Sequence, residues 1–412
     1  MSADTAVPVP TPELPPVPPG ALGRTGRRLA ASLRLAAPAL GLYAAARLAG
    51  IVCMAGWAWW VGRNPRLLLG FTWDSVWYAG IAEHGYGTVS YSDAKNLTFD
   101  DLAFFPLYPA LIRAVTTLVP FLPTLDAGLL IAWVSAGVAA WGVHAVGRRL
   151  YGRRVAALLV VLWGLLPHAI VQSMAYTEPL LTALAVWSLY AALTGRWRWA
   201  GALALLAGLA RPNGIAVALA VWACALAAIR RGGGARGGLG RDGPGRDGRG
   251  GVLLGAVLAP LGWLGYVAWV GAQRGDPLGY FAIQAKWGSR FDFGRDSFHW
   301  LRHLVVGKDH LCDYMVLAVV GAALLCLALL ALDRPPLVLL VYTLALVVIT
   351  LGGTHYFTSK PRFLLPAFPL LLPAAQALAR ARPRTAWVTV GALAGLSWAY
   401  GTYLLTVADV PL

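Results

Sequence analysis

The strongest candidate for chemistry is the carboxylate of Asp74, in the segment TWDSVWYAGIAEHGYG (72–87). Trp73, Trp77 and other apolar residues recur there at helical spacing, which predicts a short helix lying on a membrane face. A carboxylate at the start of such a helix can take a proton from a substrate hydroxyl, or it can cap the helix. Glu83 lies near the opposite end of the predicted helix, so it is either a weaker substrate contact or a solvated charge.

Three further motifs place polar side chains beside long apolar runs. The motif AYTEPL contains Tyr176 and Glu178 at the predicted mouth of a span, where a carboxylate is either functional or a helix cap. The motif ARPNG contains Arg211 and Asn213, and a buried arginine there needs an anion, either Glu178 or a substrate phosphate. The motif FFPLYP, with Tyr108, either anchors the chain in the membrane or forms the wall of a groove for a lipid chain.

Two cations, Lys360 and Arg362, precede an apolar run on the predicted external side, where the positive-inside rule does not call for them. Such a pair can hold a phosphate, which arginine binds through two hydrogen bonds, or it can extend to lipid headgroups. His299, His303 and His310 have no carboxylate in the same turn, so we predict no metal site.

The composition determines what kind of scaffold holds these residues. Hydrophobic residues make up 58% of the 412-residue chain and charged residues 13%, whereas a soluble domain carries about 25% charged residues. Repeated apolar runs of about 20 residues match the length that spans a bilayer. These features exclude a soluble enzyme and predict an all-α polytopic integral membrane protein. The four cysteines form no CxxC pair and indicate neither a disulfide framework nor a zinc site.

The basic residues predict the topology, because short cytoplasmic loops are rich in arginine and lysine. We therefore assign the arginine-rich loops to the cytoplasm: 147–154, 195–199, 230–251 and 380–384. The net charge of +16 is then a topology signal rather than a sign of nucleic-acid binding.

This assignment predicts about 11 spans, beginning at about residues 38–62. The segment 104–122 contains Arg113 and three prolines, so it is predicted as an interfacial helix of the first external loop. The chain between 199 and 230 must leave the cytoplasm and return, which predicts two half-spans broken at RPNG. The predicted organisation is a disordered Pro-rich cytoplasmic tail (1–37), a transmembrane catalytic domain (38–405) with external loops (63–124 and 272–312) and a cytoplasmic Gly/Arg linker (230–250), and a C-terminal tail (406–412).

Four motifs in order, WDSVWYAGIAEHGY, FFPLYP, AYTEPL and SKPRFLLPAFPLL, resemble the phosphatidylinositol-glycan class V (PIG-V) mannosyltransferases of the C-type glycosyltransferase (GT-C) superfamily. The resemblance implies a GT-C-type bundle whose active site faces away from the cytoplasm. It implies a mannose donor on polyprenyl or dolichyl phosphate and an inverting transfer to a lipid-linked acceptor. It also implies that the acidic residue of the first external loop is catalytic, and the matching residue here is Asp74.

We therefore expect a membrane glycosyltransferase that moves a hexose, mannose in first place, from a polyprenyl-phosphate donor to a lipid-linked or cell-envelope acceptor. Asp74 would act as the base, and Lys360, Arg362 and Arg211 would hold the departing phosphate. No cofactor is required, and a divalent metal is not indicated.

The Ala/Gly/Arg-rich composition is typical of a high-GC bacterium, so we expect a bacterial plasma membrane protein with a cytoplasmic N-terminus. The acceptor of the eukaryotic family members is not carried over. Two alternatives remain open: a transporter or flippase of polyprenyl-linked sugars, and a non-catalytic scaffold of the cell envelope.

Overall fold

The computed structural model describes residues 21–92, 98–230, 247–307, 310–408 and 410. The predictions for residues 1–20, and for most of the 230–250 linker, lie outside the described residues. The described chain is almost wholly helical and contains one antiparallel two-stranded hairpin, which the sequence did not predict. The prediction of an all-α polytopic membrane protein is confirmed.

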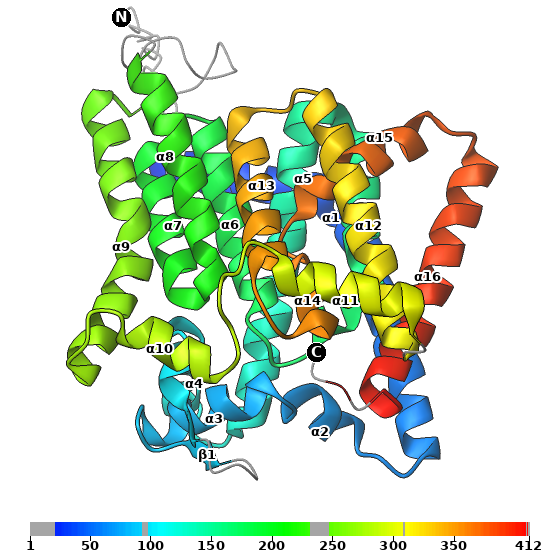
Figure 1. Ribbon diagram of the computed structural model, residues 1–412. Coiled ribbons are helices and arrows are strands. Elements are labelled where there is room, and N and C mark those ends of the chain that lie inside the picture. The colour runs from blue at the N-terminus through cyan, green and yellow to red at the C-terminus, as the bar shows by residue number, and fades with distance from the viewer. Residues whose placement is uncertain (1–20, 93–97, 231–246, 308–309, 409, 411–412) are drawn as a thin grey trace, which may run out of the picture.

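The larger helices run side by side in one bundle (Figure 1). They are α1 (Ala21–Trp60), α5 (Thr124–Gly164), α6 (Glu178–Leu193), α7 (Trp197–Ala210), α8 (Ile215–Arg230), α9 (Arg249–Arg274), α12 (Leu311–Leu332), α13 (Leu337–Gly352) and α16 (Pro383–Thr406).

Shorter elements gather mainly at the lower end of the bundle in Figure 1, which we call the Asp74 end. They are α2 (Pro65–Gly70), α3 (Asp74–His84), β1 (Ser90–Ser92), β2 (Thr98–Asp100), η1 (Asp101–Ala103), α4 (Leu107–Leu118), α10 (Gly279–Lys286) and α11 (Arg295–Val306). The remaining short elements are η2 (Ala169–Ser173), η3 (Pro212–Gly214), η4 (Phe357–Ser359), α14 (Lys360–Phe363), η5 (Phe368–Leu371) and α15 (Leu372–Arg380).

Six helices of the described chain are long and apolar enough to cross a membrane, and a bent pair at 357–380 could add a seventh. Three shorter apolar helices, α6, α7 and α13, stand beside them in the bundle (Figure 1). The count of about 11 spans therefore stays a prediction.

The apolar run that begins beside Lys360 and Arg362 is predicted from its hydropathy as a single span at about 361–379, and this prediction is wrong in form. The chain bends by 80° between Phe363 and Phe368, and separate short helices lie on either side. Pro366 and Pro369 lie at this break, and proline cannot donate the backbone hydrogen bond that a continuous helix requires. The cations of the SKPRF motif thus lie on a short helix before a bend rather than at the start of a long helix.

The predicted break at RPNG is confirmed. The helix α7 ends at Ala210, three residues form η3, and α8 begins at Ile215. The helix α7 has 14 residues, or about 21 Å at 1.5 Å per residue, which is less than a hydrocarbon core of about 30 Å. With η3, α8 spans Pro212–Arg230 and is one of the six helices long enough to cross, so the prediction that both are half-spans is not confirmed. Arg211 therefore lies at an interruption between two apolar helices.

The cytoplasmic loop predicted at 147–154 is a tight reversal within α5. Gly152 adopts φ 85° and ψ 179°, a conformation that glycine allows and that no helix contains. A Cβ built on Gly147 would lie 3.0 Å from the Cα of Ala156, so the two halves of α5 fold against each other as a hairpin.

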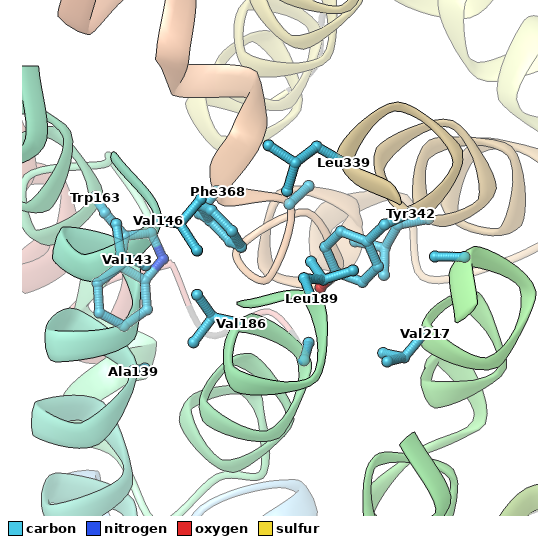
Figure 2. Close-up of a cluster of buried hydrophobic side chains, with 14 of the residues drawn as sticks. Ala139, Val143, Val146, Trp163, Val186, Leu189, Val217, Leu339, Tyr342 and Phe368 are labelled. Atoms are coloured by element: carbon cyan, nitrogen blue, oxygen red, sulfur yellow. The ribbon is translucent and has the colours of Figure 1, made fainter. Parts of the chain in front are cut away.

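Close packing between helices depends on small residues. A Cβ on Gly208 of α7 would lie 2.7 Å from the backbone nitrogen of Trp263 in α9, and Gly201 and Gly255 face each other one level along the same pair. Small residues let membrane helices approach closely. The main apolar core lies between α5, α6, α8, α13 and η5, and Figure 2 shows it around Trp163, Val186, Leu189, Tyr342 and Phe368.

Irregular backbone follows α5 inside the bundle, and Arg47 of α1 supports it. The Arg47 side chain is only 7% exposed and donates hydrogen bonds to the Ser173 hydroxyl (2.9 Å) and the Gly164 carbonyl (3.2 Å). Tyr43 donates to Gln172 of the same segment (2.8 Å). Non-helical backbone at membrane depth needs such internal partners.

The arginine-rich loops meet at the end of the bundle opposite α3 (Figure 1), which we call the basic end. Arg154 donates to the Ala381 carbonyl (3.3 Å), and the Arg198 amide donates to Asp247 (2.9 Å). The loops that the sequence assigned to one side of the membrane therefore lie at one end of the fold.

Candidate active site

The helix α3 presents Asp74 at its first residue, after a tight turn. The backbone of Trp73 adopts φ 53° and ψ −120°, a left-handed conformation that strains a residue with a side chain. The turn is closed by Thr72 and Ser75, because the Ser75 hydroxyl donates to the Thr72 carbonyl (2.6 Å) and accepts from the Thr72 amide (2.7 Å). No side chain caps the first turn of α3, so the Asp74 carboxylate is available to other partners.

Four charged side chains meet at this point from four separate elements, and we call them the charged cluster. Arg362 of α14 contacts Oδ2 of Asp74 through Nη1 at 2.8 Å. The Nε of Arg362 lies 3.2 Å from Oε1 of Glu178, at the start of α6. The same Glu178 oxygen also pairs with Arg211, which lies at the break between α7 and α8. The cluster is thus a chain of alternating charges: Asp74, Arg362, Glu178 and Arg211.

The charged cluster is buried to different depths along its length. Glu178 is 1% exposed and Arg362 is 4% exposed, whereas the Asp74 side chain keeps 25% of its surface open. Removing ions from water is costly, and only mutual pairing and hydrogen bonds offset that cost. Asp74 is therefore the most exposed member of the cluster.

Hydrogen bonding within the charged cluster is incomplete. Both carboxylate oxygens of Glu178 and the Nε of Arg362 are buried without a well-aligned hydrogen bond, although the ion-pair distances are short. Native proteins leave few such groups unsatisfied, and those that remain need an explanation. Of these atoms only the Nε of Arg362 is a donor to which an anion can bind, whereas the Glu178 oxygens need donors such as the two arginines.

Aromatic rings surround the two arginines. The Arg362 guanidinium lies 5.0 Å from the ring centre of Tyr176 and 4.9 Å from that of Phe363. Arg211 lies 5.5 Å from the Phe363 ring and donates to the Thr177 hydroxyl (2.9 Å). Stacking on aromatic faces holds a guanidinium in place while its outer nitrogens stay free to bind.

The predicted second external loop docks onto the chain segment before α14. The amide of His355 donates to Asp296 (2.9 Å), and the Tyr356 hydroxyl donates to the Trp287 carbonyl (2.8 Å). Burial, reinforced by the nearby Asp74 charge, raises the pKa of Tyr356 to about 12. Tyr356 is therefore neutral at physiological pH and acts as a hydrogen-bond donor at the border of the cluster.

The side chain of Lys360 points away from the charged cluster. Its Nζ donates to the carbonyls of Thr350 (3.0 Å) and Gly353 (2.8 Å), at the end of α13, and the side chain is buried. The carboxylates that reach Lys360 electrostatically are Asp296 and Asp292 rather than Asp74. A role for Lys360 in holding phosphate stays a prediction, and it would require the ammonium to leave these carbonyls.

The remaining predicted residues lie around the cluster rather than in it. Glu83 is exposed at the far end of α3, with His84 as its neighbour at 3.6 Å. Tyr108 is fully buried, and its hydroxyl donates to the Gly128 carbonyl (2.7 Å). Trp77 stacks on Phe104. Asn213 is half-buried in η3.

Sequence reasoning missed three neighbours of the cluster: Tyr78, Thr177 and Phe363. Thr177 links the hydroxyl of Tyr78 (3.3 Å) to Arg211. Thr177 and Phe363 lie inside the AYTEPL and SKPRF motifs, beside residues that were singled out, so those motifs could have found them. Tyr78 had no signal beyond the aromatic character of its helix.

No group of three or more His, Cys, Asp or Glu side chains within the described ranges is arranged to hold a metal ion. The cations of the charged cluster are both arginines, which remain protonated in proteins. Both arginines are already paired with Asp74 or Glu178, so the cluster neutralises an anion only when that anion replaces one of these carboxylates.

The fold and the cluster together define a helical membrane protein that carries a carboxylate at the first loop of its bundle. A solved structure with a similar fold is that of ArnT from Cupriavidus metallidurans bound to undecaprenyl phosphate. ArnT matches with a TM-score of 0.52 at 16% identity, over 90% of this chain and 62% of its own.

The archaeal oligosaccharyltransferase AglB from Archaeoglobus fulgidus, in complex with an inhibitory peptide and a dolichol-phosphate, has a TM-score of 0.46 at 13% identity. That match covers 90% of this chain and 56% of AglB. The chain thus spans less than two thirds of the length of either protein. No family profile matches the sequence, and no curated protein does either.

Proposed function

We propose that the protein is a membrane glycosyltransferase that uses a polyprenyl-phosphate-linked sugar as donor. The single observation that carries this proposal is the ion pair between Asp74 and Arg362 at the mouth of a GT-C-type bundle. It joins a partly open carboxylate to a buried guanidinium, which are the two groups that a sugar transfer from phosphate requires. ArnT, which shares the fold, was solved with undecaprenyl phosphate bound.

The proposed mechanism begins with an exchange of partners. The donor phosphate binds Arg362 and Arg211 through charge-assisted hydrogen bonds, and Arg362 releases Asp74. The hydroxyl of the acceptor then attacks the anomeric carbon and gives its proton to Asp74, while the bond from that carbon to the phosphate oxygen breaks. The electron pair stays on the phosphate, which the two arginines stabilise. Phosphate is a good leaving group, so a second carboxylate acting as a general acid is not needed.

The finer assignments rest on the resemblance to the PIG-V mannosyltransferases. They are mannose as the transferred sugar, inversion at the anomeric carbon, and a lipid-linked or cell-envelope acceptor. The proposed setting is the plasma membrane of a bacterium, with the Asp74 end outside and the basic end in the cytoplasm.

Activity is tested directly by incubating membranes that contain the protein with polyprenyl-phospho-mannose. Mass spectrometry of the lipid and envelope fractions should find a product heavier by one hexose, absent from membranes that carry the Asp74→Asn protein. Equal product from both membranes would refute Asp74 as the base. A polyprenyl-phospho-glucose donor run in parallel tests the sugar.

Orientation is tested by cysteine labelling in intact cells, after the four native cysteines are replaced. A cysteine at Ser92, in the hairpin of the Asp74 end, should react with an impermeant thiol reagent. A cysteine at Arg382, in the exposed loop before α16, should react only after the cells are opened. Reversed labelling would place the proposed site in the cytoplasm.

A further inference from the structure

A cavity of about 280 Å³ opens beside the turn that presents Asp74. Its lining includes Thr72 and Trp73 of that turn, Leu68 of α2, Leu404 of α16, and Arg63 after the end of α1. At about 30 Å³ per water molecule, the cavity has room for roughly nine waters. That is the space of one ring-sized polar group, and not of a whole glycolipid.

Trp73 forms an aromatic wall of this cavity. Trp73 is 39% exposed, and leucine side chains line the cavity beside it. The left-handed backbone at Trp73 is strained, and strain of this kind is found mainly at functional sites. An exposed indole held in this strained turn, one residue before the proposed base, offers an apolar face to the flat C–H face of a sugar or cyclitol ring.

Arg63 supplies the charge. No ion pair of Arg63 is seen in the described part of the chain, whereas its neighbour Arg66 pairs with both oxygens of Asp126. Arg63 follows the exposed Trp59 and Trp60 at the end of α1, where tryptophans mark the membrane interface. An anion at headgroup level could therefore reach Arg63 while a ring lies against Trp73.

We propose that this cavity is the acceptor subsite, which takes one polyhydroxylated ring against Trp73 and an anionic substituent at Arg63. This inference rests on the proposed function. Single displacement requires the attacking hydroxyl and the leaving phosphate on opposite faces of the anomeric carbon. Arg362, Arg211 and Asp74 do not line the cavity, which reaches the turn through Thr72 and Trp73, the two residues before Asp74. The donor phosphate and the acceptor ring therefore have separate places.

Kinetics in phosphatidylcholine nanodiscs test the assignment, with polyprenyl-phospho-mannose as donor and hexyl glucoside or its 6-phosphate as acceptor probes. Trp73→Ala should raise KM for both probes by about 10-fold, while Trp73→Phe, which keeps an aromatic face, should recover most of the loss. Arg63→Gln should raise KM by about 10-fold for the phosphorylated probe only. Donor KM should not change. Trp60→Ala and Arg66→Gln are matched controls outside the cavity and should leave both acceptor KM values unaltered.

Three results would overturn the assignment or part of it. An unchanged acceptor KM in Trp73→Ala and in Trp73→Gly, which also relaxes the backbone, would refute the proposal that this cavity is the acceptor subsite. A raised donor KM instead would make the cavity a donor site. An Arg63→Gln effect seen only when phosphatidylglycerol is added to the nanodiscs would show that Arg63 holds a neighbouring lipid headgroup, and would refute the anionic acceptor.

Direct binding separates this inference from the proposed function. Equilibrium dialysis of radiolabelled hexyl glucoside 6-phosphate, without donor, should show binding that Trp73→Ala weakens by about 10-fold. If the protein shows such binding but transfers no sugar from any polyprenyl-phosphate donor, the proposed transferase function is refuted and the proposed binding site in the cavity is supported. Transfer without dependence on Trp73 in either assay would support the transferase and refute the cavity.

Discussion

Arg362 and Arg47 are both arginines buried within the helical bundle, but their partners are of opposite kinds. Arg362 lies between two carboxylates, Asp74 and Glu178. In the described part of the chain Arg47 has only neutral acceptors, the hydroxyl of Ser173 and the carbonyl of Gly164. A guanidinium paired with a carboxylate can exchange it for another anion at little cost in charge. A guanidinium held by a carbonyl and a hydroxyl stabilises one backbone conformation.

Under the proposed function, Arg362 is a buried charge that exchanges one anionic partner for another. Arg47 is a buried charge that stabilises a backbone segment. Arg47 holds the irregular segment after α5, and that segment leads directly to Tyr176 and Glu178. Arg362 then meets Glu178 from the other side. Arg47 therefore supports the segment that leads to Glu178, and Arg362 contacts Glu178 itself. Mutation of Arg47 should affect stability, and mutation of Arg362 should affect donor kinetics.

The largest effect is expected at the carboxylate that distinguishes the two sites. Asp74→Asn removes the proposed base and should reduce kcat by about 10²-fold or more, the usual scale for general base catalysis. The amide is of equal size, so membrane insertion and thermal stability should stay close to those of the wild type. Near-normal turnover would mean that Asp74 only anchors Arg362. Arg362 would then be a structural arginine, as Arg47 is.

Removing Arg362 should affect use of the donor. Arg362→Ala takes away charge-assisted hydrogen bonds of about 1.5–3 kcal/mol each, which corresponds to about 10- to 150-fold in kcat/KM for the donor. Arg362→Lys should restore only part, since lysine cannot bind phosphate through two parallel hydrogen bonds. Initial rates at varied donor and saturating acceptor measure this. Unchanged donor kinetics in both variants would exclude Arg362 as a phosphate ligand.

Removing Arg47 should affect stability instead. Arg47→Met leaves the Gly164 carbonyl and the Ser173 hydroxyl without their buried donor, at a cost of about 1–3 kcal/mol. The melting temperature in detergent should fall, while kcat and donor KM of the folded fraction stay within about 2-fold. Adding Ser173→Ala should recover part of the loss, because one unsatisfied group is removed. A raised donor KM with normal stability would show that Arg47 also acts on substrate.

The smallest effect is expected at Glu83. This residue shares α3 with Asp74 but is exposed and has His84 as its close neighbour. Glu83→Gln should change kcat and both KM values by less than about 2-fold, since exposed ion pairs contribute about 0–1 kcal/mol. A loss as large as that of Asp74→Asn would mean that α3 carries two functional carboxylates.

Local patterns in the sequence were enough to predict the membrane class and the break at RPNG. They also singled out Asp74, whose catalytic role stays a prediction. They were not enough to predict which side chains contact one another in the folded protein. Asp74 and Arg362 are 288 positions apart, and no spacing rule connects residues that only helix packing brings together. Lys360 and Arg362 appeared equivalent in sequence, yet the short helix turns one toward carbonyls and the other toward carboxylates. The 80° bend beyond Phe363 depends on how several prolines divide one apolar run, and the hydropathy of that run does not reveal the bend.

The backbone of Trp73 has a consequence for protein engineering. Glycine adopts its φ and ψ without strain, so a screen for heat-resistant variants of this protein should enrich Trp73→Gly. The same change would remove the indole that lies beside the proposed base. We therefore expect selection for thermal stability to favour glycine at position 73 and selection for turnover to favour tryptophan. A variant stabilised for structure determination by this change would have low activity.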